Sequence, residues 1–234
     1  MEAIVLAGGL GTRLRSAVPD LPKCMAPING IPFISYLIDH LQKEGVTHFI
    51  FSLGYKSATF LSVLEEKLPK HNYKVLIEQE PLGTGGAIKL ACTNATQQHV
   101  IALNGDSLFK VNVKELMQFH KAKKSQCTLA LKPMQNFERY GSVEIDEIQK
   151  IKSFKEKQFM ASGCINGGVY AIEVASFLQK PLADKFSMEQ DYLEKYTAEG
   201  NFYGFVQDGY FIDIGIPEDY ALSLIHISEP TRPY

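Results

Sequence analysis

The chain has 234 residues, its formal net charge is −2, and 45% of its residues are hydrophobic. This length and apolar content suit one domain with a well-buried core, and the near-neutral charge gives no reason to expect nucleic acid or an anionic membrane as a partner. Because no apolar run approaches the thickness of a bilayer and the N-terminus starts directly with a strand pattern instead of a signal segment, we expect a cytoplasmic protein.

The first half of the chain alternates strand patterns with amphipathic helix patterns. Runs rich in β-branched and aromatic residues predict strands at residues 3–6, 46–53, 74–77, 100–103 and 127–131. Apolar residues at helical spacing predict helices at 32–44, 57–68, 84–91 and 113–123. The last helix has Asn112 as its cap and Glu115 three residues later. Such alternation predicts an α/β fold with a Rossmann-like, mainly parallel sheet, helices on both faces, and ligands at the carboxyl ends of the strands.

Beyond Pro133 the predicted strands are shorter and lie closer together. We expect strands at 142–145, 151–154, 168–171, 203–206 and 211–214, with a helix at 188–198. These strands predict a small mixed or antiparallel half. Because no linker-like run or internal repeat interrupts the chain, we expect one domain over residues 1–224, with halves at 1–133 and 134–224.

The residue pattern changes near the C-terminal end of the chain. Residues 217–224 begin a helix with Pro217 at its start. Residues 225–234 abandon the helical period and contain two prolines. We expect this segment to be an atypical tail, foreign or truncated, that is frayed or loosely docked.

Neither the cysteines nor the histidines form a recognisable metal or redox motif. The four cysteines, Cys24, Cys92, Cys127 and Cys164, are scattered with no C-x-x-C, and the six histidines lack a spacing such as H-E-x-x-H. We therefore expect the cysteines to be reduced and mostly packed in the core.

A glycine-rich loop directly follows the first strand pattern. Its glycines Gly8, Gly9 and Gly11 allow backbone N–H groups to approach an anion, and Thr12 and Arg13 add a hydroxyl and a fixed cation. A dinucleotide-binding G-x-G-x-x-G would need a third glycine where this chain has leucine, and a Walker loop would need G-K-[S/T]. The loop predicts a polyphosphate site of another kind; the alternative is a glycine-rich surface turn.

A second glycine motif, E-P-L-G-T-G-G-A at residues 80–87, also follows a strand and opens a helix. A carboxylate at Glu78 or Glu80 could accept hydrogen bonds from guanine N1–H and N2–H2 together. A uracil or cytosine edge lacks this donor pair, which favours GTP. The alternative for each glutamate is a surface position beside a capped helix start.

Two aspartates lie at the ends of separate strand patterns. Asp106 closes N-G-D after strand 100–103, and Asp213 lies in F-I-D-I-G. Carboxylates at strand ends suit Mg²⁺, which takes one or two protein carboxylates together with phosphate oxygens. Together they predict a metal site, although N-G-D alone is also a turn sequence.

The glycine-rich loop, followed by Pro22 and Lys23, resembles the L-x-G-G-x-G-T-R-L…P-K signature of the sugar-1-phosphate nucleotidyltransferases, and the later motifs follow in that family's order over residues 1–220. The resemblance implies a nucleotide-diphospho-sugar transferase, GT-A-like fold, Mg²⁺ as cofactor, and a nucleoside triphosphate and a sugar 1-phosphate as substrates. Within the family, the compact length and L-P-K-x-M-A-P look most like the D-glycero-α-D-manno-heptose-1-phosphate guanylyltransferases, which make GDP-heptose for bacterial surface polysaccharide. The runner-up is a mannose-1-phosphate guanylyltransferase or another short hexose-1-phosphate nucleotidyltransferase.

The resemblance also implies three sets of site residues. The nucleotide-binding set is Leu6, Ala7, Gly8, Gly9, Gly11, Thr12, Arg13, Lys23, Glu78, Glu80, Gly83, Thr84, Gly85 and Asp106. The sugar-phosphate-binding set is Gly141, Glu156, Lys157, Asn166, Glu189 and Asp191, although helix capping explains Glu189 and Asp191 almost as well. The metal-binding pair is Asp106 and Asp213.

The implied reaction is nucleotidyl transfer, in which an oxygen of the sugar 1-phosphate attacks the α-phosphorus in line and pyrophosphate leaves. The nucleophile is already ionised near pH 7, so that no general base is needed. The catalytic roles fall to Arg13 on the leaving diphosphate, Lys23 near the α-phosphate and Lys157 on the acceptor phosphate. A hypothesis of another class is an inactive nucleotide-sugar-binding regulatory protein, which need not retain these cations and the aspartates. The sequence leaves the oligomeric state open, including a homo-oligomer.

Overall fold

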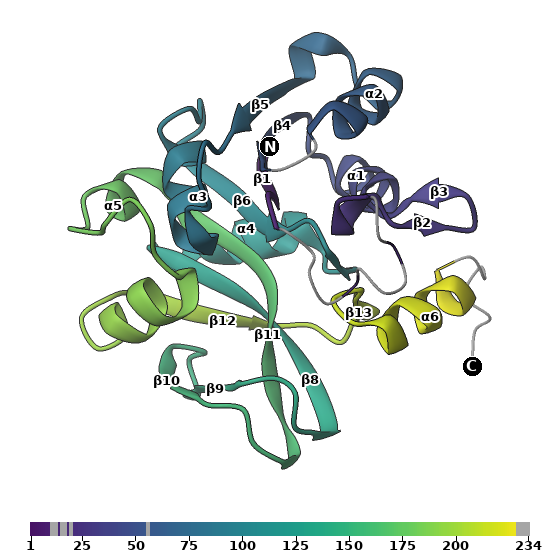
Figure 1. Ribbon diagram of the computed structural model, residues 1–234. Helices are drawn as coiled ribbons and strands as arrows, with labels where there is room; N and C mark the ends of the chain where they lie inside the picture. Colours follow the sequence, from purple (N-terminus) through teal and green to yellow (C-terminus); the bar gives the residue numbers. More distant parts are fainter. Residues whose placement is uncertain (10–13, 15–17, 19–20, 55–56, 228–234) are drawn as a thin grey trace.

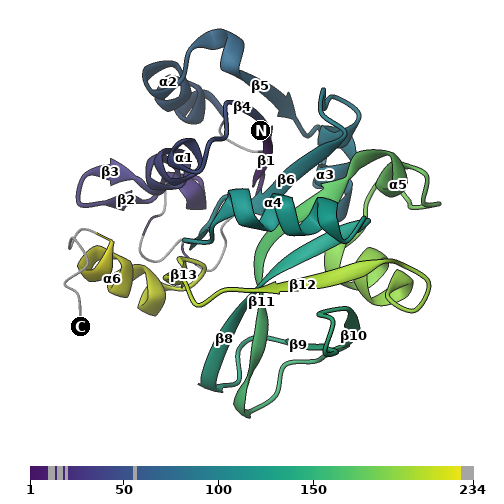
Figure 2. The same cartoon turned by 180° about the vertical axis from the view of Figure 1, so that it is seen from behind.

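A nine-stranded mixed sheet runs through the molecule, with helices on both of its faces (Figures 1 and 2). The computed structural model describes residues 1–9, 14, 18, 21–54 and 57–227. The first half contributes four parallel neighbours in the order β5-β4-β1-β6, which are β1 (Glu2–Ala7), β4 (His48–Leu53), β5 (Tyr73–Ile77) and β6 (His99–Asn104). This arrangement confirms the Rossmann-like layer expected from the alternating pattern.

Strands β1, β4 and β6 of this layer are buried on both faces, whereas the edge strand β5 is partly exposed. Along β1, Ala3 and Val5 pack into one core and Ile4 packs into the other, because successive side chains of a strand point to opposite faces. The first core lies under α1 (Phe33–Lys43), α2 (Ser57–Lys67) and α4 (Val113–Ala122). The second lies under α3 (Gly83–Cys92), α5 (Val174–Leu178) and η4 (Met188–Glu194), a π-helix within the predicted helix 188–198.

The second half is largely antiparallel, as expected. Its strands are β8 (Cys127–Phe137), β9 (Ser142–Ile145), β10 (Ile151–Lys155), β11 (Met160–Glu173) and β12 (Phe202–Val206). Strand β11 pairs with β8 along its length, with β9 at Ile165, and with β6 near its end. The two halves therefore share one continuous sheet.

Strand β11 is much longer than the predicted strand 168–171. Its register against β8 shifts between Asn166 and Tyr170, where Gly167 and Gly168 interrupt the apolar pattern. Gly168 has a φ of +70°, a conformation that glycine adopts readily. The shift is a β-bulge, a feature that often re-aims side chains beside functional sites.

Short elements complete the fold. They are the hairpin of β2 (Pro27–Ile28) and β3 (Ile31–Pro32), the pair of β7 (Ser107–Phe109) and β13 (Phe211–Asp213), the 3-10 turns η2 (Lys23–Met25) and η3 (Lys70–Asn72), and α6 (Pro217–His226). Helix α6 lies beside the β2–β3 hairpin, and the Tyr220 hydroxyl donates to the Pro27 carbonyl at 2.6 Å (Figure 1).

The helix α6 ends later than the sequence pattern predicts. It includes Ile225 and His226, the first two residues of the segment 225–234 that we expected to lack helical structure. The correction has a local reason, because the two prolines come only after this point and no helix breaker precedes them. Residues 228–234 lie outside the described part of the chain.

The cysteines are packed as expected. Cys24, Cys92 and Cys127 are buried, Cys164 is partly buried, and all four are free thiols. Burial raises the pKa of Cys24 and of Cys92 to about 12, which keeps these thiols protonated and unreactive. Within the described residues, no helix has the length and apolar character needed to cross a membrane.

Candidate active site

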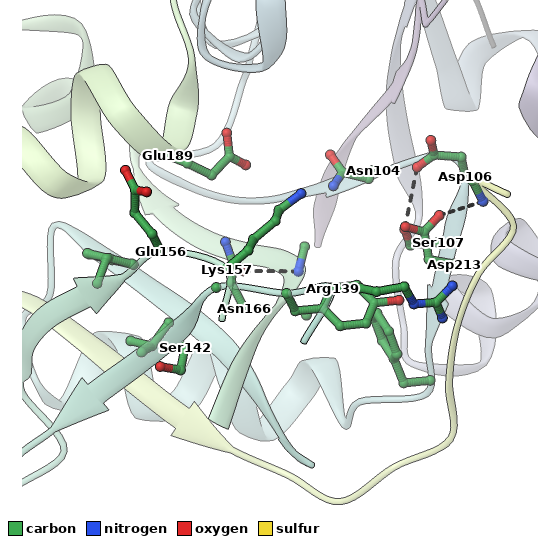
Figure 3. A pocket seen from close by; sticks show the side chains of 18 of the residues that line it. Asn104, Asp106, Ser107, Arg139, Ser142, Glu156, Lys157, Asn166, Glu189 and Asp213 are labelled. Carbon is green, nitrogen blue, oxygen red and sulfur yellow. Dashed lines mark hydrogen bonds between the residues drawn. The ribbon is translucent and has the colours of Figure 1, made fainter. Parts of the chain in front are cut away.

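Two strand ends bring the predicted metal ligands together. Strand β6 ends in a turn at Gly105, whose N–H donates to the carbonyl of Leu6 at 2.8 Å, and Asp106 follows. Strand β13 pairs antiparallel with β7 so that Asp213 lies opposite Ser107, and Ile214 N donates to the Asp106 carbonyl at 3.1 Å. The two carboxylates therefore lie side by side (Figure 3).

Lys23 occupies the space between these carboxylates. Its Nζ lies 2.5 Å from Asp106 Oδ2 and 3.5 Å from Asp213 Oδ1. Burial raises the pKa of Asp213, the Lys23 charge opposes that shift, and the nearby Asp106 charge adds to it. The site is thus a partly buried pair of anions that already holds one cation.

The donor set fits Mg²⁺. Among the described residues, no group of three or more His, Cys, Asp or Glu side chains gathers around one point. Asp106 and Asp213 therefore supply two carboxylates, and the Lys23 ammonium shows that a cation fits between them. Two carboxylates suit Mg²⁺ in nucleotide sites, because this ion keeps several waters and takes few protein ligands besides phosphate oxygens.

A cleft with a volume of about 900 Å³ extends from this pair to the second half of the sheet. The predicted residues that line it are Gly9, Lys23, Asp106, Gly141, Glu156, Lys157, Asn166, Glu189 and Asp213. They come from both halves of the chain, and Figure 3 shows Glu156, Lys157, Asn166 and Glu189 on the opposite side from Asp106 and Asp213, with the Lys157 side chain extending between them. Ligand pockets usually measure about 300–1,000 Å³, so that this cleft is large enough for a sizeable ligand or a pair of ligands.

Glu189 and Asp191 make different contacts in the structure. Asp191 Oδ2 accepts from the N–H of Ser187 at 2.7 Å, and Ser187 Oγ in turn accepts from Gln190 N at 3.3 Å. This is a helix-capping arrangement at the start of η4, and Asp191 does not line the cleft. The capping alternative thus describes the contacts of Asp191, and its role toward a sugar stays a prediction, whereas Glu189 does line the cleft.

The loop at residues 78–86 packs against the protein more closely than the sequence indicated. Glu78 Oε1 accepts from Ser52 Oγ at 2.9 Å, and its Oε2 accepts from Leu82 N at 3.1 Å. Glu80 is exposed and forms no hydrogen bond with any described residue. Neither glutamate lines the cleft as it stands.

The glycines of this loop have packing reasons of their own. A Cβ on Gly83 would lie 2.6 Å from the Phe186 carbonyl oxygen, and a Cβ on Gly85 would lie 2.1 Å from the Phe186 ring. The N–H of Gly85 donates to the same carbonyl at 3.0 Å, and the Thr84 hydroxyl donates to Glu189 Oε2 at 3.0 Å. These contacts explain why glycine is needed here, while the role of Gly83, Thr84 and Gly85 toward a nucleotide stays a prediction.

The glycine-rich loop after β1 is described only in part, at Gly8, Gly9 and Leu14. Leu6 and Ala7 end β1, and a Cβ on Gly8 would lie 2.6 Å from Glu78 Oε1. Gly9 has open space around it and lines the cleft. The predicted positions Gly11, Thr12 and Arg13 fall outside the described residues.

Among the cleft side chains that the predicted site sets did not include are Asn104, Arg139 and Tyr170. Asn104 and Tyr170 line the cleft between the two halves, and Arg139 lines it near Asp213. Arg139 Nη2 donates to both carboxylate oxygens of Asp219, at 3.0 and 2.9 Å. Each lies within two residues of a position or motif that sequence reasoning used, so that adjacency was the available signal.

Two carboxylates at strand ends, Lys23 of η2 between them and Lys157 from the second half are typical of a site for phosphorylated substrates. Residues 2–227 match the family model described as nucleotidyl transferase, and the chain belongs to this family. It is a nucleotidyltransferase with a GT-A-like fold.

Two curated enzymes and one solved structure are similar to most of the chain. Two enzymes named D-glycero-alpha-D-manno-heptose 1-phosphate guanylyltransferase resemble the chain. That from Aneurinibacillus thermoaerophilus is 49% identical over 94% of this chain and 95% of its own length. That from Campylobacter jejuni is 41% identical over 97% and 100%. The crystal structure of HddC from Yersinia pseudotuberculosis complexed with GMP-PN superposes with a TM-score of 0.86, at 38% identity over 97% of this chain and 99% of that one.

Proposed function

We propose that this enzyme transfers GMP from GTP to D-glycero-α-D-manno-heptose 1-phosphate, giving GDP-heptose and pyrophosphate. The observation that carries the proposal is a single cleft with Lys23 and two carboxylates at one end and Lys157 at the other. Such a cleft suits two anionic substrates that must approach each other. Similarity to two curated enzymes of that name, at 49% and 41% identity, supports the choice of substrates.

The chain's own groups position and neutralise the substrates. Asp106 and Asp213 would hold Mg²⁺, which when bound supplies positive charge to the phosphate oxygens of both substrates. Lys23 would move from the carboxylates to the α-phosphate, and Lys157 would hold the acceptor phosphate. Arg13 would bind the departing diphosphate. Because the attacking phosphate oxygen is already ionised, these groups need only align it with the phosphorus and stabilise the charge that develops.

The second substrate side is formed by Gly141, Glu156, Asn166 and Glu189, for which we propose contacts to the sugar. All four line the cleft: Gly141 precedes β9, Glu156 follows β10, Asn166 lies on β11 and Glu189 on η4. A carboxylate accepts two hydroxyl donors, and an amide both donates and accepts, which suits a polyhydroxylated ring.

For the base we propose that Glu78 or Glu80 accepts the two guanine donors. Glu78 is held in place by Ser52 and Leu82 and keeps spare lone pairs, whereas Glu80 is free to turn. The variants Glu78→Gln and Glu80→Gln distinguish the two glutamates. Replacing the glutamate that binds guanine should lower the preference for GTP over ATP, and replacing the other one should not. Two variants with unchanged base preference would contradict both assignments.

The test of the function is a pyrophosphate-release panel that crosses GTP, ATP, CTP, UTP and dTTP with heptose, mannose and glucose 1-phosphates, beside Asp106→Ala. We expect release only with GTP and the heptose phosphate, and loss of it in the variant. Release with mannose 1-phosphate would keep the mechanism and replace the substrate. No release with any pair, from a folded protein, would favour an inactive regulatory protein.

We also propose that the enzyme works in the cytoplasm and serves surface polysaccharide synthesis. Four free cysteines, three of them buried, suit a reducing compartment. A redox-insensitive activity, equal with and without reductant, would agree with the packed thiols.

A further inference from the structure

A chain of hydrogen bonds joins the acceptor side of the cleft to the loop that opens α3. Asn166 Nδ2 donates to the Tyr170 hydroxyl oxygen at 2.9 Å, and that hydroxyl donates to Glu189 Oε1 at 3.0 Å. The other carboxylate oxygen of Glu189 accepts from the Thr84 hydroxyl at 3.0 Å and from Ser187 Oγ at 3.0 Å. Two side chains proposed to bind the sugar are thereby tied to a residue of the proposed base loop.

The Tyr170 hydroxyl is the central group of this chain of hydrogen bonds. A phenol hydroxyl has one proton to donate and lone pairs to accept with, and here one contact of each kind goes to Asn166 and Glu189. Tyr170 is 1% exposed, so that water has little access to replace it. Burial and the neighbouring Glu189 charge raise the pKa of this hydroxyl well above its ordinary value, which keeps the proton in place at working pH.

The backbone reinforces the link between η4 and the base loop. Phe186 N donates to the carbonyl of Leu82 at 3.0 Å, and Gly85 and Gly86 donate back to the Phe186 carbonyl at 3.0 and 3.3 Å. The N–H of Met188, the first residue of η4, donates to Thr84 Oγ1 at 2.9 Å. A displacement of Glu189 in the first turn of η4 therefore acts directly on the loop at residues 82–86.

We propose that Tyr170 is a positioning residue that couples the two substrate sites, so that binding of the sugar phosphate strengthens binding of the nucleotide and the reverse. This inference rests on the proposed function, which assigns the sugar to Asn166 and Glu189 and the base to the loop before α3. A sugar hydroxyl bound to Glu189 sets the orientation of its carboxylate, and the same carboxylate holds Thr84. The coupling must be reciprocal, because the total free energy of binding both ligands does not depend on which of them binds first. Each ligand therefore changes the affinity for the other by the same factor.

The decisive variant is Tyr170→Phe, which removes the hydroxyl and keeps the buried ring. Its matched control is Tyr192→Phe, because Tyr192 is fully buried in the same core and its hydroxyl has no hydrogen-bond partner within the described residues. Both variants lose one buried phenolic oxygen. Only the first breaks the chain between the two sites.

The measurement is equilibrium binding of a GTP analogue with a methylene bridge between the α- and β-phosphates, with and without saturating heptose 1-phosphate, and the converse titration. We expect each ligand to tighten the other by roughly tenfold in the wild type and in Tyr192→Phe, and by less than about twofold in Tyr170→Phe. Thr84→Val, which breaks the chain at its other end, should reduce the coupling in the same way. In turnover, Tyr170→Phe should raise the KM of both substrates more than it lowers kcat.

Tyr170→Phe that retains the wild-type coupling factor would overturn the inference, as would equal loss in the Tyr192→Phe control. Failure of the proposed function has a different signature. A wild-type protein that binds neither ligand and releases no pyrophosphate would overturn the function and this inference together, whereas an active wild type with uncoupled sites would overturn the inference alone.

Discussion

At the scale of single residues, Lys23 forms ion pairs with two carboxylates of the cleft. Its ammonium faces two carboxylates at once, and its side chain is only 16% exposed. Without this charge Asp106 and Asp213 would repel each other, and burial already raises the pKa of Asp213. The lysine therefore organises the carboxylate pair before any substrate arrives.

Lys23→Gln should lower kcat/KM for GTP by on the order of a hundredfold or more, because it removes a cation aimed at the charge that develops during transfer. The measurement is pyrophosphate release at varied GTP. Lys132→Gln is the matched control, because Lys132 pairs with the exposed Asp208 outside the cleft and should change the rate little. A Lys23 variant with nearly wild-type activity would contradict the assignment.

His120 makes stability depend on pH far from the active site. It is fully buried, its Nε2 lies 3.1 Å from His99 Nδ1, and its Nδ1 lies 2.9 Å from Thr128 Oγ1. Burial, together with the His99 and Lys121 charges and against the opposing Glu173 charge, lowers its pKa from 6.5 to about 4. The folded protein therefore keeps this imidazole neutral where the unfolded chain would protonate it.

Between pH 6.5 and pH 4 the unfolded state binds a proton at His120 that the folded state does not, so that the free energy of unfolding falls as pH falls. From pH 7.5 to 5.5 this group alone should lower it by about 1 kcal/mol. Urea unfolding at both pH values measures the change. His120→Gln should reduce the pH dependence by that amount, and His71→Gln, an exposed histidine, should not; equal pH dependence in all three proteins would refute the role of burial.

At the scale of elements, α6 holds the loop that precedes Gly141. Asp219 in its first turn accepts both hydrogen bonds from Arg139, and Arg139 lines the cleft two residues before Gly141. The guanidinium is about half exposed, so that this ion pair contributes little to stability. Its effect should instead be on the position of the acceptor loop.

Asp219→Ala should raise the KM for the sugar phosphate roughly tenfold and leave the KM for GTP nearly unchanged, because a small displacement of a substrate-positioning loop weakens catalysis strongly. Steady-state kinetics with each substrate varied in turn measures the difference. Glu218→Ala, the exposed neighbour in the same helical turn, serves as the control. Equal changes in both KM values would indicate a general disturbance of the fold instead.

The N-terminal end of helix α4 is held by a local side-chain cap and by a contact from a residue distant in sequence. The predicted cap is confirmed, because Asn112 Oδ1 accepts from Glu115 N at 3.0 Å. The reciprocal contact of a capping box does not form. Gln207, distant in sequence, accepts from Asn112 N at 2.7 Å and donates to Glu115 at 3.1 Å. A helix cap can be predicted from four consecutive residues. The contact with Gln207 depends instead on the position of the chain directly after β12.

At the scale of the whole molecule, the continuous sheet should make the two halves unfold together. Strand β11 pairs with β6 of the first half and with β8 and β9 of the second. The two cores face each other across shared strands, so that neither half buries its apolar surface alone.

Chemical unfolding should therefore give one transition that coincides in far-UV circular dichroism and in tyrosine fluorescence, with the whole transition shifted upward by GTP. Tyrosine is a suitable probe because the chain has 11 tyrosines and no tryptophan. Two separated transitions would contradict the single-domain prediction for residues 1–224.

Much of the candidate site could be predicted because its residues belong to short motifs at strand ends. Asp106, Lys157 and Asn166 line the cleft as expected. Asp191 does not line the cleft although Glu189 does, and both lie in the first turn of one helix. Sequence spacing cannot tell which of two nearby acids points to solvent-side backbone donors and which points to a cleft.

The sequence by itself determined the alternating strands and helices of the first half, the cap of α4 and the family, because these depend on apolar periodicity and on motifs of a few adjacent residues. Only the tertiary structure decided that β11 runs through N-G-G as one bulged strand, that Lys23 lies between Asp106 and Asp213, and that Tyr170 links Asn166 to Glu189. Each of these depends on pairing and packing between segments distant in the chain. No periodicity or short motif specifies such pairing and packing, which is why the sequence pattern did not show these contacts.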